Sequence, residues 1–347
     1  LTLPGPPRTD YRHFSSRAYF TYTPHETQFQ QGYLGIQPSK IKGTFHLRYP
    51  TSQPLLVERI EITFKGKGSV KWKQGKREYR RVNKFFRLTK EIWSSLARGY
   101  FEPITSLDLP FDFIIPDVSP STITQIDNGS INYSIKAKIY RKSNFIVKNS
   151  SKVIEVWVNI NRWNFPPTPD YEISPIVKRF EMFECQMILD RTVFGANDVI
   201  NVSIRFILFD MRVNVKKVLI KLKQYHRLKS SLDSKLTKRY VAGDEVSGDQ
   251  ILMSSDLLNE FLVERKLNLR EGHDRSRDLR CSCNTVLMDI WHKVKVKVYM
   301  GNTETSYVGF EKDVKICNVA PVNSFIIGLE ERTVTRSTIQ SSLDTNE

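Results

Sequence analysis

The chain has 347 residues and a formal net charge of +16, with 53 Lys and Arg against 37 Asp and Glu. A chain of this length typically forms about two domains, and its 40% hydrophobic content excludes general disorder. Four cysteines are too few for a disulfide framework at this length. The positive charge favours acidic partners, which include phosphorylated tails, acidic peptides, anionic lipid and nucleic acid.

The first elements follow a proline-containing start. Residues 1–30 show little periodicity and are predicted to form a flexible tail. Residues 35–49 and 55–64 alternate apolar and polar side chains between turn residues, which predicts two strands. Residues 65–84 are predicted to form a hairpin that turns near Gly75.

This predicted hairpin is strongly basic. Glu78 is the only acidic residue in it. Its basic residues are the candidate contact for an anion or a cargo protein: Lys65, Lys67, Lys71, Lys73, Lys76, Arg77, Arg80, Arg81 and Lys84. At about 1 kcal/mol per basic residue near a charged surface, they would favour phosphorylated or acidic tails or anionic lipid. The alternative is a solvated strand edge on which lysines prevent aggregation.

Further strands complete the first half. Residues 109–115 are an apolar strand that runs into a proline-punctuated connection. Residues 129–141 alternate with a period of two, which predicts a half-buried strand, and residues 151–160 form another. Residues 161–175 contain four prolines and are predicted to be an inter-domain linker.

The strand pattern then restarts at residues 180–189, 198–209 and 213–224. In the last of these, the alternation breaks at Lys216 and Lys217, which predicts a β-bulge. The lysines between the apolar positions are expected to lie on solvent faces that stacked strands can join into a concave basic surface.

The end of the chain is more polar. We expect a strand at 238–242, a short helix at 256–266, and strands at 281–300 and 307–317. Residues 322–347 are rich in Ser and Thr and are predicted to be a disordered tail.

Strands nowhere alternate regularly with helices, which argues against parallel βαβ folds. The sequence therefore predicts an all-β fold of two consecutive antiparallel immunoglobulin-like β-sandwiches. The expected domains are a tail at 1–30, one sandwich at 31–160, a linker at 161–175, a second sandwich at 176–321 and a tail at 322–347.

Several of these strands resemble those of a known family. Leu109-Pro-Phe-Asp-Phe-Ile-Ile-Pro, a Ser/Pro connection, and Ile131-Asn-Tyr-Ser-Ile-Lys-Ala occur in the order found in the amino-terminal domain of the arrestin family. Ile60-Glu-Ile-Thr-Phe-Lys-Gly is similar to the Ile-x-Ile-x-Phe-x-Gly strand of that domain. Residues 192–204 and 288–298 resemble strands of the carboxy-terminal domain.

The resemblance is to the α-arrestin-like proteins of fungi, which link membrane cargo to HECT-type ubiquitin ligases through Pro-Pro-x-Tyr motifs. It implies a cytoplasmic adaptor, without catalysis or cofactor, that binds acidic or phosphorylated tails of membrane proteins and couples them to trafficking or ubiquitination machinery. Residues 6–11 and 166–171 have three residues between prolines and tyrosine instead of one, which departs from the ligase motif.

Other functions have weaker support in the sequence. A nucleic-acid-binding β-protein is the main alternative, because Trp72, Tyr79, Phe85 and Phe86 lie among basic residues and would stack on bases. Those aromatics, however, occupy positions expected in strand cores. No enzyme motif is recognisable.

Cys281 and Cys283, together with His273 and His292, are a candidate metal site. Zinc sites usually use a second pair of cysteines, and alternate strand positions share a face, so two core cysteines are the simpler interpretation and no metal is expected.

Overall fold

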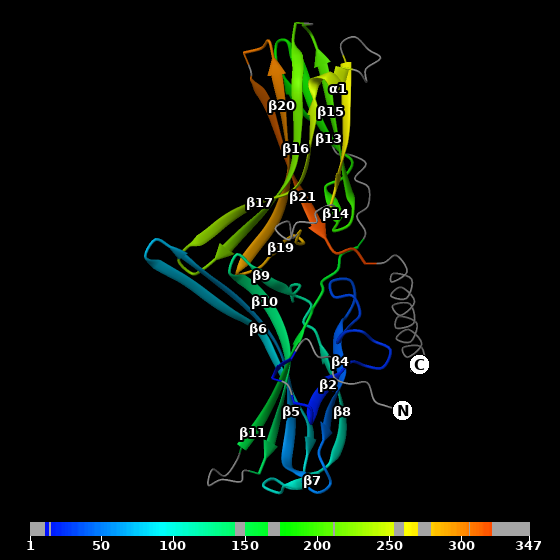
Figure 1. Ribbon diagram of the computed structural model, residues 1–347, viewed down its shortest axis with the longest axis vertical. Coiled ribbons are helices and arrows are strands. Elements are labelled where there is room, and N and C mark those ends of the chain that lie inside the picture. The colour runs from blue at the N-terminus through cyan, green and yellow to red at the C-terminus, as the bar shows by residue number, and fades with distance from the viewer. Residues whose placement is uncertain are drawn as a thin grey trace, which may run out of the picture. The chain divides into compact units, whose positions relative to one another are not determined.

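The structure is a computed structural model that describes residues 11–13, 15–142, 150–165, 174–210, 212–252, 260–269, 279–304 and 306–320. The chain forms two compact units, one of residues 1–163 and 230–233 and one of residues 164–229 and 234–347. Figure 1 shows that the described residues are nearly all β-strand. The only helix among them is α1, Gly248–Leu252. The predicted all-β class is therefore confirmed. Among the described residues, none of the helical segments is long and apolar enough to cross a bilayer.

The first unit contains a large antiparallel sheet in which consecutive strands are hydrogen-bonded in the order β1-β11-β10-β5-β6. Their bounds are β1 Tyr11–His13, β11 Ser150–Val158, β10 Gly129–Arg141, β5 Leu55–Gln74 and β6 Arg77–Ser94. Two short strands extend it, because β7 Glu102–Ile104 pairs with β5 and β9 Ile123–Ile126 pairs with β10. The predicted hairpin at residues 65–84 is confirmed.

A second, smaller antiparallel sheet shares the core of this unit. It consists of β2 Ala18–Thr21, β3 Gln30–Gln31, β4 Lys40–Arg48 and β8 Ser106–Ile114. Phe64 on β5 and Phe113 on β8 join the two sheets, with their ring centroids 6.0 Å apart. Both side chains are buried because apolar residues alternate along each strand and face the other sheet.

The prediction of a flexible tail at residues 1–30 is wrong for its second part, which contains strand β2. Strand β2 pairs with β4, and Ala18 and Phe20 are fully buried. Phe20 packs against Phe45 and Phe111, with centroid distances of 5.0 and 5.7 Å. Burial of this ring stabilises a strand too short to show a periodic pattern in the sequence. Residues 1–10 lie outside the described residues.

The second unit also has two sheets around one core. The smaller is antiparallel and contains β12 Ile176–Arg179, β13 Phe183–Leu189, β15 Val199–Leu208 and β18 Glu260–Asn268. The larger contains β14 Val193–Gly195, β21 Tyr307–Cys317, β20 Met288–Gly301, β16 Asn214–Lys229 and β17 Ser234–Ser247, and β19 Cys283–Asn284 pairs with β20. Strand β14 runs parallel to β21, and the remaining pairs are antiparallel.

Two details of this unit bear on the sequence predictions. The bulge predicted at Lys216 and Lys217 is confirmed, because the pairing of β16 with β20 shifts between Val215 and Lys217. The short helix predicted at 256–266 is wrong from residue 260 onward. There β18 pairs with β15, and Phe261, Val263 and Leu267 are buried in the shared core. Residues 253–259, 166–173 and 321–347, which include parts of the predicted helix, linker and tail, lie outside the described residues.

Candidate functional site

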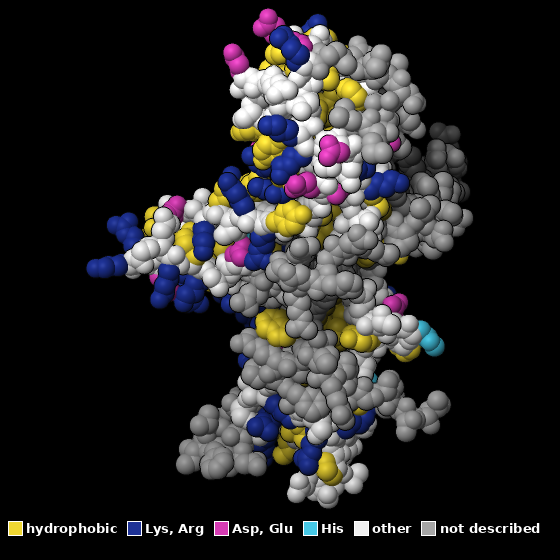
Figure 2. Space-filling model, turned by 45° about the horizontal axis from the view of Figure 1, so that its top comes forward, with side chains coloured by type: hydrophobic (Ala, Val, Ile, Leu, Met, Phe, Trp, Pro, Cys, Tyr) yellow, Lys and Arg dark blue, Asp and Glu magenta, His cyan; other side chains and the backbone are white. Residues whose placement is uncertain are grey.

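The basic hairpin extends past the end of its sheet. Strand β10 pairs with β5 only as far as Val70, which lies opposite Gly129. Beyond this point β5 and β6 pair only with each other, from Trp72 opposite Tyr79 to the turn at Gly75. Figure 1 shows this two-stranded end projecting from the first unit, and in Figure 2 Lys and Arg side chains gather on it. This end of the hairpin therefore carries a concentrated positive charge.

A bulge in β6 decides which side chains share a face. Gly66 lies opposite Phe86, but Lys67 lies opposite Lys84, so Phe85 has no partner on β5. Side chains point alternately to the two faces of the strand before and after this extra residue. Across the bulge, the odd-numbered and even-numbered residues of β6 therefore exchange faces. As a result, the even-numbered residues 78–84 face the same side as the odd-numbered lysines of β5.

We call this side the hairpin face, and it consists of Lys67, Lys71, Lys73, Arg80 and Lys84. All of these side chains are exposed. Lys67 lies directly opposite Lys84, and Lys71 directly opposite Arg80. Like charges in opposite positions of an antiparallel pair destabilise it. The arrangement has an energetic cost in the free protein that a bound anion would relieve.

Glu78 is the one acidic side chain of the hairpin end. Its Oε1 lies 3.0 Å from Lys71 Nζ. The hydrogen bond from Lys71 lowers the pKa of Glu78, so this carboxylate stays ionised through the neutral range. A single carboxylate leaves most of the positive charge of the hairpin face uncompensated.

The other predicted site residues lie elsewhere. Lys76 and Arg77 are exposed at the turn, and Arg81 lies opposite Val70 on the other face. Lys65 binds Glu155 at 2.7 Å. The predicted basic segment of residues 65–84 omits one further basic residue. Arg87 is exposed and lies opposite Lys65. The turn at Gly75 places Gln74 opposite Arg77, and regular alternation from there gives the grouping as far as Lys67 and Lys84.

The second face of the hairpin is largely apolar. Trp72 is 2% exposed and stacks on Tyr79, with centroids 5.3 Å apart and an interplanar angle of 13°. Phe86 stacks on Tyr133 at 6.0 Å. These rings pack inside the protein, so the surface of Trp72 is not open to a base.

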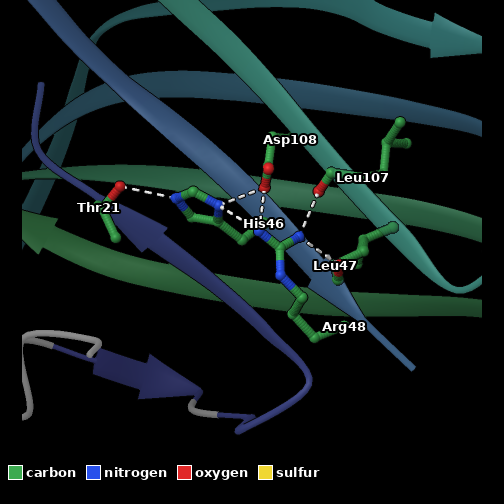
Figure 3. Close-up of polar contacts among 6 residues, drawn as sticks. All are labelled: Thr21, His46, Leu47, Arg48, Leu107 and Asp108. Atoms are coloured by element: carbon green, nitrogen blue, oxygen red, sulfur yellow. Dashed lines mark hydrogen bonds and ion pairs between the residues drawn. The ribbon is translucent and has the colours of Figure 1, made fainter. Parts of the chain in front are cut away.

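A second polar cluster in this unit joins three neighbouring strands (Figure 3). His46 on β4 has its Nε2 2.7 Å from Thr21 Oγ1 on β2 and its Nδ1 2.6 Å from Asp108 Oδ1 on β8. The order hydroxyl, imidazole, carboxylate is that of a nucleophilic triad. The three residues are far apart in the sequence, and only strand pairing brings them together.

The surroundings of this cluster favour a structural role. Arg48 Nη2 donates to the same Asp108 oxygen at 2.5 Å. Burial raises the pKa of Asp108, but the hydrogen bonds from His46 and Arg48 outweigh it and lower that pKa overall. A carboxylate already paired with Arg stabilises an imidazolium less. The ring of Tyr19 also stacks on His46 at 4.9 Å. We interpret the cluster as a tie that holds β2 to the sheet.

The candidate metal residues have other partners. Cys281 Sγ donates to Asn318 Oδ1 at 3.2 Å, and His292 lies between Gln224 and Ser282. Burial raises the pKa of the Cys281 thiol to about 11 and that of Cys283 to about 12. Within the described ranges, no three His, Cys, Asp or Glu side chains are placed to hold a metal ion. His273 lies outside these ranges.

Neither known protein families nor curated protein sequences gave a match to this chain.

Proposed function

We propose that the protein is an arrestin-like adaptor, made of two immunoglobulin-like β-sandwiches, that binds acidic or phosphorylated tails of membrane proteins through the hairpin face. The single observation that carries the proposal is the pairing of like charges, Lys67 with Lys84 and Lys71 with Arg80, on a two-stranded projection. The two-unit antiparallel β architecture is compatible with the arrestin-like assignment.

Binding would depend on charge neutralisation. A phosphate group carries close to two negative charges at neutral pH and accepts several hydrogen bonds. Arg80 would donate two parallel hydrogen bonds to such a group, while lysines act as mobile point charges. An anion between Lys71 and Arg80 would replace their repulsion with two attractive contacts. Each substitution on the hairpin face should therefore reduce both affinity and the sensitivity of binding to salt.

The adaptor would act by recognition and coupling in protein transport and endocytosis, with no bond made or broken and no cofactor. It would be cytoplasmic and reach membranes through its cargo. A HECT-type ubiquitin ligase is a second proposed partner, and anionic lipid would compete with cargo for the same cations. The altered tyrosine motif at 166–171 lies outside the described residues, so the ligase proposal depends on the sequence resemblance alone.

The test is charge reversal on the hairpin. The combined variant Lys71→Glu, Lys73→Glu, Arg77→Glu and Arg80→Glu is compared with a control of equal charge change, Arg98→Glu, Lys178→Glu, Lys216→Glu and Lys266→Glu, at exposed positions elsewhere. The probe is a labelled peptide in phosphorylated and unphosphorylated forms, followed by fluorescence anisotropy at low and at ~0.15 M salt.

We expect the hairpin variant to lose affinity for the phosphorylated peptide by about tenfold or more, while the control retains it. Wild-type binding should weaken as salt rises. If the hairpin variant binds as well as wild type at low salt, the hairpin is only a solvated strand edge and the proposed cargo contact is wrong.

A further inference from the structure

The second unit carries another basic surface, on the exposed side of its larger sheet. Strands β16 and β20 lie side by side there. Their buried side chains, among them Ile220, Leu222, Val294 and Val296, face the core. The intervening residues point the other way and form what we call the lysine face: Lys217, Lys221, Lys223, Lys293, Lys295 and Lys297. None of these residues belongs to the hairpin face.

The lysine face also pairs like charges. Lys221 lies directly opposite Lys295, and Lys223 directly opposite Lys293. Opposed lysines at this spacing destabilise an antiparallel pair. A surface that only needed to be soluble would alternate the signs of its charges. The pairing therefore points to a role in binding an anion.

Carboxylates flank this surface on both sides. On one side, Glu245 of β17 lies 3.1 Å from Lys217. The other side is formed by β21. Glu311 on β21 pairs with Lys295 and lies 3.7 Å from Lys293, and Asp313 lies 3.6 Å from Lys293. The hydrogen bond that Lys295 donates to Glu311 raises the pKa of Lys295. Within the described part of the chain, Lys221 and Lys223 have no carboxylate at ion-pair distance. The uncompensated charge thus includes Lys221 and Lys223 in the middle of β16, between the carboxylates of Glu245 and Glu311.

A hollow with an aromatic floor lies at one end of the lysine face. Tyr225 and Trp291 form this floor, stacked at 5.3 Å with an interplanar angle of 12°. Leu236, which is 47% exposed, also lines this open hollow of about 700 Å³. The rest of its rim is largely charged, with Arg227 and Lys238 beside the carboxylates of Asp289, Glu311 and Asp313. A shallow aromatic floor next to a row of cations suits a ligand that has both acidic and apolar groups.

We propose that the lysine face binds an extended acidic peptide segment that runs along β16 and β20 and places one aromatic or aliphatic side chain in the hollow. Side chains on one face of a strand repeat every ~6.8 Å, and an extended peptide presents its alternate side chains at the same repeat. Acidic residues at alternate positions would therefore meet successive lysines. The carboxylates of Glu311 and Asp313 would repel the peptide from β21 and set its lateral position.

The aromatic floor of the hollow separates this ligand from a lipid surface, because lipid headgroups supply charge but no ring or apolar side chain for the floor. The bases of a nucleic acid would stack on the same floor, so an oligonucleotide is one of the comparison ligands. The inference is independent of the proposed cargo contact, because it concerns other residues in the other unit.

The test uses a synthetic peptide with Glu at alternate positions and one terminal Phe. The comparison ligands are a peptide of the same composition with its Glu residues contiguous, a peptide with Ser in place of Phe, vesicles containing phosphatidylserine, and a single-stranded oligonucleotide. Binding is followed by fluorescence anisotropy, or by sedimentation for vesicles, at ~0.15 M salt.

The key variant is Lys221→Gln with Lys223→Gln, and its matched control is Lys216→Gln with Lys266→Gln, two exposed lysines off the lysine face. Replacement of Lys221 and Lys223 leaves no carboxylate unpaired and relieves the repulsion between opposed lysines. The thermal midpoint of this variant should therefore not fall. We expect a loss of affinity for the alternating peptide of about tenfold, with the control and the hairpin charge-reversal variant unchanged. A third variant, Leu236→Ser, should bind the Phe-containing peptide less tightly and should bind the Ser-containing peptide with unchanged affinity.

Equal binding of the alternating peptide by wild type and by the Lys221/Lys223 variant would overturn the proposal. So would equal affinity for the contiguous peptide, the vesicles or the oligonucleotide, because the face would then be a general polyanion surface. If the hairpin variant alone loses the peptide, the ligand binds the hairpin face instead.

Discussion

Lys65 on β5 and Glu155 on β11 form a 2.7 Å ion pair that spans the intervening strand β10. Ser134 of β10 donates to the same carboxylate at 2.8 Å. The Glu155 side chain is 6% exposed, whereas that of Lys65 is 34% exposed. Lys65 therefore differs from the other basic residues of the hairpin, because it neutralises a buried charge.

Replacing Lys65 should reduce stability. In Lys65→Met, the buried carboxylate of Glu155 would lose this ion pair, and we expect the free energy of unfolding to fall by about 1–3 kcal/mol, less than for a fully buried pair because Lys65 is partly solvated. Urea denaturation followed by circular dichroism measures this loss. Lys67→Met, on the exposed hairpin face, is the control and should change stability little. Equal effects of the two variants would show that the ion pair contributes nothing specific.

The stability of the second unit should depend on acid through His292. Burial, and then the charge on His226, lowers the pKa of His292 to about 3. Below about pH 6.5 the unfolded chain binds a proton here and the folded chain does not, so the free energy of unfolding falls as pH drops toward 3. The loss from one such group is about 2 kcal/mol between pH 7.5 and 5.

In His292→Gln, the free energy of unfolding should fall less as the pH drops, because glutamine does not titrate. Thermal midpoints measured across the same pH range test the expectation. The idea fails if the variant and wild type show the same dependence on pH.

Gly66 should not tolerate a side chain. A Cβ there would lie 2.7 Å from Tyr133 Cε1 and 2.9 Å from Phe86 Cε1. Tyr133 cannot move freely because its hydroxyl donates to Pro120 O at 2.6 Å. We expect Gly66→Ala to reduce the free energy of unfolding by about 1–3 kcal/mol, as other overpacked sites do. In Gly309→Ala, the new Cβ would meet only Tyr307 at 3.6 Å, and stability should be unchanged or rise.

Oligonucleotide binding should be weak at ~0.15 M salt, because nonspecific phosphate contacts release counterions and weaken as salt rises. Trp72 is buried against Tyr79, so it should not contribute to any change in fluorescence. Titration of wild type and Trp72→Phe with single-stranded DNA and RNA tests this. Tight binding with quenching that disappears in Trp72→Phe would favour the nucleic-acid alternative over the adaptor.

Strands with long, regular alternation were predictable from the sequence. Residues 129–141 and 307–317 became β10 and β21 because one face of each strand packs in a core and the other is polar. The bulge in β16 was visible as a break in alternation. Strand β18 was not predictable, since its identity depends on pairing with β15, and local spacing suggested a helix instead.

The sequence predicted which segment contains the candidate site, but it did not predict which side chains of that segment share one surface. Its composition identified nine basic residues, but the register set by the turn at Gly75 and the ion pair of Lys65 decide which of them act together. The tie between Thr21, His46 and Asp108 had no sequence signal, because it arises from strands that meet only in the folded unit. Which side chains come together depends on the pairing of strands that are distant in the sequence, and the local patterns of a single sequence show little of that pairing.

The unpaired Phe85 makes this hairpin unusually sensitive to length changes. Deletion of Phe85 would remove the bulge and leave Lys67 opposite Lys84. Deletion of Arg81, Val82 or Asn83 would instead invert the side chains between the deleted residue and the turn, turning Arg80 inward and Tyr79 outward. Related chains in which the hairpin keeps its charge should therefore vary in length at residue 85, or by two residues at a time near the tip, and not by one.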